Sequence, residues 1–121
     1  MKTMLRMLAA TMVLGWVAAA HAEAPAPSKV TPELIEAARK EGKVVWYTSV
    51  DVQVAERVAK AFEAKYPGVP VTVERSGSER VFQRLGQEYG SNIHAADVVN
   101  SSDAAHFIIW KKNGWLAPYV P

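Results

Sequence analysis

Apolar and polar residues follow one another along the chain in two distinct patterns. Short runs rich in β-branched residues predict strands at 43–48, 69–74 and 96–100. Elsewhere apolar residues recur every three or four positions, which is the spacing of one helix face. This spacing predicts helices at 32–41, 52–66, 78–89 and 104–112. One helix followed by three strand-helix units is typical of an α/β fold, with a parallel sheet and helices on both faces.

Residues at the segment ends support these boundaries. Thr31 precedes Pro32, an N-cap followed by a residue suited to the first helical turn, and Gly42 ends that helix. Asp103 is the expected N-cap of the last helix, and Pro70 weakens ladder pairing at the start of the second strand. Six aromatic residues are predicted to be in the core: Trp46, Tyr47, Phe62, Phe82, Trp110 and Trp115.

The first 22 residues form the three-part pattern of a secretory signal peptide. Lys2 and Arg6 supply the positive region, residues 7–20 are uncharged and apolar, and Ala20-His21-Ala22 offers the small residues of a cleavage site. A membrane-spanning anchor is the alternative, but the apolar run is shorter than the ~20 residues that a span needs. We therefore expect cleavage after Ala22, no stable membrane anchor and a periplasmic location. Residues 23–30 are expected to be a flexible leader, and 31–121 the folded part.

Composition narrows the class of protein. Half of the residues are hydrophobic and 21% are charged, which excludes a disordered chain, and there is no cysteine to form a disulfide. Of 14 Lys and Arg, two lie in the signal peptide, so 12 cations remain against 12 Asp and Glu. A neutral mature chain without a basic stripe gives no indication of nucleic-acid binding.

Candidate chemistry gathers at the carboxyl ends of the three predicted strands. In open parallel sheets this edge carries the ligand site. The segments that follow the strands are 48–51, 75–78 and 100–103, all short, polar and rich in hydroxyl groups. Helix N-termini at these positions favour an anionic or acceptor-rich ligand, although the same residue types also serve as ordinary helix caps. The predicted ligand-binding residues are Thr48, Ser49, Asp51, Gly77, Ser78, Ser101 and Ser102.

No motif indicates catalysis, a metal or a cofactor. The sequence has no G-x-S-x-G turn, no HExxH pair and no P-loop. His106 is the one base positioned near a loop serine, and a packed or solvated role suits it as well. We therefore predict no catalytic residue, no metal site and no cofactor.

Four segments together resemble a known family. They are Glu41–Ser49 (EGKVVWYTS), Ala61–Gly68 (AFEAKYPG), Ala96–Val99 (ADVV) and Gly114–Tyr119 (GWLAPY). Their order and intervals are similar to those of the extracellular solute-binding proteins of ABC importers, in the branch that binds ferric iron and small organic anions. The resemblance implies a periplasmic-binding-protein type II lobe, of which the chain holds the first three β-α units, with the ligand bound by the loops after these strands. It also implies an inner-membrane ABC permease as partner.

Two departures limit what the resemblance implies. Iron-binding members have a His in the first loop, where this chain has Val50-Asp51-Val52. Members are also roughly three times as long, so we expect this chain to be an N-terminal fragment that lacks the second lobe. The leading hypothesis is a periplasmic receptor for a small polar or anionic solute, with ferric iron or an iron complex among the possible solutes. The alternatives are a periplasmic hydrolase that uses a loop serine, or a small sensor or interaction domain.

Overall fold

The computed structural model describes residues 25–121, so the predicted signal peptide at 1–22 lies outside the described residues. Four helices and three strands follow one another in the predicted order. Their bounds are α1 Pro32–Glu41, β1 Val44–Thr48, α2 Val52–Lys65, β2 Val71–Arg75, α3 Ser78–Gly90, β3 Val98–Val99 and α4 Ala104–Lys112. Within the described residues, no helix is long and apolar enough to cross a membrane.

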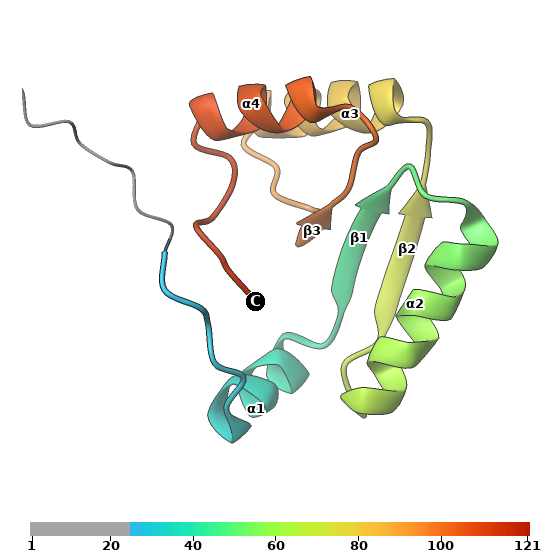
Figure 1. The fold of residues 1–121 in the computed structure, drawn as a ribbon, viewed down its shortest axis with the longest axis vertical. Helices are drawn as coiled ribbons and strands as arrows, with labels where there is room; N and C mark the ends of the chain where they lie inside the picture. The colour runs from blue at the N-terminus through green and yellow to red at the C-terminus, as the bar shows by residue number, and fades with distance from the viewer. Residues whose placement is uncertain (1–24) are drawn as a thin grey trace, which may run out of the picture.

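The three strands form a parallel sheet in the order β2-β1-β3, as the alternation of strands and helices predicts. Val44 pairs with Val71 and Thr48 with Arg75, so β1 and β2 end at the same level. Tyr47 pairs with Val99. All three carboxyl ends therefore meet at one edge, toward which the arrowheads point in Figure 1.

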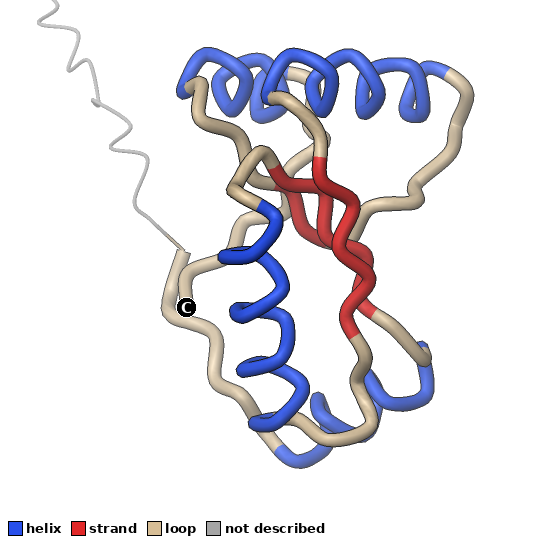
Figure 2. Tube along the Cα trace, turned by 90° about the vertical axis from the view of Figure 1, so that its right-hand side faces the viewer, coloured by secondary structure: helices blue, strands red, loops and turns tan. Residues whose placement is uncertain are grey.

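Helices lie on both faces of the sheet, which confirms the predicted fold class. On one face Val45 and Tyr47 of β1 pack against Val81 and Leu85 of α3 and Trp110 of α4. The helices α3 and α4 lie side by side, as Figure 1 and Figure 2 both show. The other face carries α2, whose buried residues are Ala55 and Ala59. Small residues let this helix approach the strands closely.

The predicted helix ends are confirmed where a cap was recognised. The Thr31 side chain accepts a hydrogen bond from the Leu34 N–H, and Gly42 adopts a left-handed conformation, φ 94°, at the end of α1. Asp103 accepts from the Ala105 N–H at the start of α4. Two helix ends differ from the prediction by one residue: Tyr66 is the C-cap of α2, and Gly90 is the last residue of α3.

All three strands are shorter than predicted, and β1 begins one residue late, at Val44 rather than residue 43. The second strand begins at Val71 rather than residue 69, because Pro70 has no N–H and only its carbonyl joins the ladder, accepting from Val44 N at 2.9 Å. The third strand comprises only Val98–Val99 rather than 96–100. Just before it, the Asp97 carboxylate accepts the Val45 N–H at 2.7 Å, so a side chain takes the place of a backbone carbonyl.

The aromatic core prediction was correct for some residues and wrong for Phe62. Tyr47 and Trp110 are buried, with 2% and 0% exposure. Trp46, Phe82 and Trp115 are half-buried. Phe62 remains 36% exposed, because α2 packs against the sheet through alanines instead.

The predicted leader has no helix or strand over residues 25–30. Its backbone nevertheless contacts the other end of the described chain, where the Ser28 N–H donates to the Val120 carbonyl at 2.7 Å.

Candidate functional site

Backbone hydrogen bonds join the loops that follow the three strands. The Ser76 N–H donates to the Thr48 carbonyl at 3.0 Å, and the Asn100 N–H donates to the Tyr47 carbonyl at 2.8 Å. These bonds extend the parallel ladder by one step beyond the strands. The loops after β2 and β3 therefore both start beside the end of β1, as the parallel sheet predicts.

Ser78 and Ser102 bring the second and third loops into direct side-chain contact. Their hydroxyl oxygens lie 2.5 Å apart, and the Ser102 N–H also donates to Ser78 Oγ at 3.2 Å. Ser78 is half-buried at the start of α3, whereas Ser102 is exposed. Two of the predicted ligand-binding residues thus share one small surface between the N-termini of α3 and α4.

Thr48 supports this edge from the interior of the protein. Its side chain is fully buried, its hydroxyl donates to Asn100 Oδ1 at 3.3 Å, and Thr48 Oγ1 accepts the Val50 N–H at 3.1 Å. Both hydrogen-bonding directions of the hydroxyl are therefore used within the protein. Its role in this structure is to hold the first and third loops together. Ser49, the next residue, is half-buried.

Asp51 is used as a helix cap. Its carboxylate accepts the N–H groups of Gln53 and Val54, at 2.9 and 3.4 Å, at the start of α2. This is the ordinary structural role that the sequence left open for such residues. The first loop is also tied to the second, since Arg75 Nε donates to the Val50 carbonyl at 3.4 Å.

The N-terminus of α3 differs from those of α2 and α4 because its cap residue, Gly77, has no side chain to accept a hydrogen bond. A Cβ built on Gly77 would meet no atom within 4 Å, so the fold itself does not need glycine there. A polar cavity of about 620 Å³ lies at this helix end. It is lined by Arg75, Ser76, Gly77, Ser78, Glu79, Arg80 and Gln83. Uncapped N–H groups beside two arginines favour an anion or a carbonyl-rich solute.

Ser101 contacts a residue that the sequence alone left without a clear role. Ser101 Oγ lies 2.8 Å from Nδ1 of His106, and it also accepts the Asp103 N–H at 3.1 Å. His106 is 5% exposed, and its ring stacks on Phe82 with 4.4 Å between centroids. The solvated role considered for His106 is therefore wrong, and the packed role is correct. The signal in the sequence was the placement of a serine two residues before the Asp103 cap, with a histidine in the first turn that follows.

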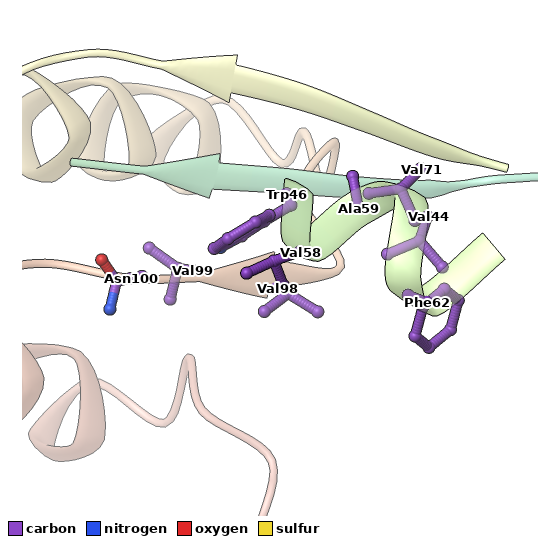
Figure 3. A pocket seen from close by; sticks show the side chains of 9 residues that line it. All are labelled: Val44, Trp46, Val58, Ala59, Phe62, Val71, Val98, Val99 and Asn100. Atoms are coloured by element: carbon purple, nitrogen blue, oxygen red, sulfur yellow. The ribbon is translucent and has the colours of Figure 1, made fainter. Parts of the chain in front are cut away.

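A second, apolar groove lies on the face of the sheet that carries α2. It has a volume of about 380 Å³, and Figure 3 shows Trp46, Val58 and Val98 among its side chains. Asn100 stands at one end, near the strand-end loops, and Phe62 at the other. Nearly all of this lining is hydrocarbon, with the Asn100 amide as the exception, so it offers few polar groups to orient a small polar solute. No group of three or more His, Cys, Asp or Glu that could hold a metal ion occurs among residues 25–121.

Comparison with known protein families identifies one that the chain matches. Residues 46–121 match the family model of the bacterial extracellular solute-binding proteins. The matched segment runs from β1 to the end of the chain, so it includes all three strand-end loops. No curated protein matches the chain significantly.

Proposed function

The chain belongs to the bacterial extracellular solute-binding protein family, and we propose that it binds a small polar or anionic solute at the edge formed by its three strand-end loops. The contacting groups in this proposal are Ser49, Gly77, Ser78, Ser101 and Ser102. Thr48 and Asp51 act behind them, as the residues that fix the first loop.

The observation that carries the proposal is the direct contact between Ser78 and Ser102. It makes one surface out of two loops that are 24 residues apart in sequence. Hydroxyl groups both donate and accept, so this surface suits a solute with carboxylate, phosphate or hydroxyl oxygens. A ferric-iron complex with organic anions belongs to the same class of solute.

The family and the N-terminal sequence support a proposal about the wider setting of this function. We propose that the signal peptide at 1–22 directs the chain to the periplasm, where it delivers its solute to an inner-membrane ABC permease. Intact mass measurement of exported protein tests the first step. Cleavage after Ala22 leaves Glu23 as the first residue, and a retained Met1 contradicts it.

Calorimetric titration with a panel of small carboxylates, sulfate, phosphate and ferric citrate tests the solute-binding site. We expect Ser78→Ala and Ser102→Ala each to weaken binding of the solute by about tenfold, which corresponds to one hydrogen bond of about 1.4 kcal/mol. Ser91→Ala is the matched control, because Ser91 is an exposed serine at the opposite end of α3. Equal affinity in all three variants would refute the site.

A hydrolase is the second candidate function, and the contact of Ser101 with His106 is the observation that favours it. In this mechanism His106 Nδ1 would take the Ser101 proton as the hydroxyl oxygen attacks the ester carbonyl, and would return it to the alcohol as the ester C–O bond breaks. A water deprotonated by His106 in the same way would then release the acid from Ser101. Glu79 Oε2 lies 3.5 Å from Nε2. Hydrolysis of a chromogenic ester, lost in both Ser101→Ala and His106→Asn, would support it. If the protein binds solute but does not hydrolyse the ester, the hydrolase function is refuted and the receptor function remains.

A further inference from the structure

Of the two hydrogen bonds at Ser101, only the one with His106 can run in either direction. The Asp103 N–H can only donate, so Ser101 Oγ accepts that bond at 3.1 Å. The second contact is with His106 Nδ1 at 2.8 Å, and a ring nitrogen either donates or accepts there according to where the imidazole carries its hydrogen. The state of His106 therefore decides which way the Ser101 O–H points.

The surroundings of His106 select the form of its neutral ring. Nε2 faces two carboxylates, Glu79 Oε2 of α3 at 3.5 Å and Asp103 Oδ2 at the start of α4 at 3.8 Å. Because carboxylates only accept, the hydrogen of the neutral ring belongs on Nε2, and Nδ1 then accepts from the Ser101 hydroxyl. Stacking against Phe82 and packing against Trp110 keep the ring in this orientation.

Protonation of the ring reverses the bond with Ser101. We propose that His106 is a positioning residue for the solute-binding edge, which withholds the Ser101 hydroxyl proton from the solute when neutral and releases it when protonated. In the imidazolium form Nδ1 carries a hydrogen and donates to Ser101 Oγ. Ser101 then accepts two hydrogen bonds, and its own O–H is free to donate to an oxygen of the solute. This inference rests on the proposed function, because it assigns a regulation to the same edge.

Glu79 and Asp103 limit the charge effect of this switch. They are the described carboxylates within 4 Å of the ring nitrogen Nε2. An imidazolium between them is compensated, so an anionic solute gains mainly a new hydrogen-bond donor. We expect solute affinity to be about tenfold higher at about pH 5.5 than at about pH 8.

Calorimetric titration with sulfate at these two pH values tests the proposal, since sulfate keeps its charge between them. His106→Asn places a polar atom near the position of Nδ1 but cannot be protonated, and Ser101→Ala removes the switched hydroxyl. Both variants should bind sulfate with equal affinity at the two pH values. His94→Asn is the control, because His94 packs against Tyr89 at the other end of the sheet, and it should keep the pH dependence. A wild-type affinity that does not change with pH, or a pH dependence that survives in His106→Asn, overturns the proposal.

Nuclear magnetic resonance of the imidazole nitrogens separates this inference from the proposed function. His106→Asn identifies the His106 signals, since His94 is the other histidine that remains after the expected cleavage at Ala22. At about pH 8 we expect the hydrogen on Nε2, and a change of the Nδ1 shift in Ser101→Ala. A hydrogen on Nδ1 at this pH overturns the inference even if sulfate binds. If sulfate does not bind at either pH, the anion-binding function is contradicted, and the nitrogen shifts alone decide whether His106 controls Ser101.

Discussion

Ser78 and Ser102 lie at the start of two different helices, yet their hydroxyl oxygens are 2.5 Å apart. The parallel sheet explains this proximity. The loops after β2 and β3 begin on opposite sides of β1, and α3 and α4 then lie on the same face of the sheet. The two helix N-termini therefore converge, and one hydroxyl pair closes the gap between them.

Removing either hydroxyl should reveal this coupling in the stability of the protein. Ser78→Ala and Ser102→Ala each lose the shared hydrogen bond, so we expect each to lower the free energy of unfolding by about 0.5–1.5 kcal/mol. The double variant should lose clearly less free energy of unfolding than the sum of the two single losses, because the shared hydrogen bond can be removed only once. Urea unfolding of the four proteins measures this coupling, and strictly additive losses would contradict the contact.

Gly77→Ala separates the requirements of the fold from those of the solute. A Cβ at this position meets no atom within 4 Å, and the backbone of Gly77, φ −66° and ψ 151°, suits any residue. We expect the melting temperature to change little, whereas solute affinity should fall by at least tenfold if the solute approaches this backbone closely. Calorimetry and a thermal melt measure the two effects. An unchanged affinity would mean that the solute does not approach Gly77.

The sequence predicted the fold well where a local signal agreed with the tertiary structure. Thr31, Gly42 and Asp103 mark helix ends through their own backbone and side-chain chemistry, and each lies where that chemistry requires. The third strand was overestimated because nothing local shows that the Asp97 carboxylate takes the Val45 N–H. That contact joins residues 52 positions apart and exists only once the sheet has formed.

Contacts between distant parts of the chain also limited the prediction of the candidate site. The three hydroxyl-rich loops were recognisable because parallel strands must end at a common edge. Which hydroxyls face outward was not recognisable, since Thr48 and Ser49 are neighbours of similar polarity and only Thr48 is fully buried. The role of His106 depended on Phe82 and Glu79, which come from another helix.

Leu85 and Ile108 give a matched test of the core between the sheet and the helices. Leu85 of α3 is 4% exposed within the core cluster, whereas Ile108 of α4 is 68% exposed. Leu85→Ala should lower the free energy of unfolding by about 2–4 kcal/mol, a large part of what a small domain has, through lost burial and a residual cavity. Ile108→Ala should stay within about 0.5 kcal/mol of the wild type. Similar losses in the two variants, measured by urea unfolding, would contradict this packing.

Replacing Asp97 by asparagine should affect stability less than replacing it by alanine. Its Oδ2 accepts the Val45 N–H at 2.7 Å, a group that lies within the central strand. Asp97→Ala leaves this donor unsatisfied and should cost about 1–3 kcal/mol. Asp97→Asn keeps an acceptor oxygen and should cost less than half as much. Hydrogen exchange at the Val45 amide provides a direct check, since it should quicken in the alanine variant and change little in the asparagine variant.

Ionisation of Tyr47 should lower the stability of the protein at alkaline pH. Burial, together with the hydrogen bond that the Tyr47 hydroxyl donates to Glu88 Oε1 at 2.9 Å, raises the pKa of Tyr47 from 10.0 to about 12. Because the unfolded chain loses this proton at a lower pH than the folded chain, the stabilisation is complete below about pH 10 and declines as the pH rises toward 12. Tyrosinate absorbance should show one late ionisation step that is missing in Tyr47→Phe. The variant should also lose stability less steeply over this interval, and an equally steep loss would assign the alkaline transition to another group.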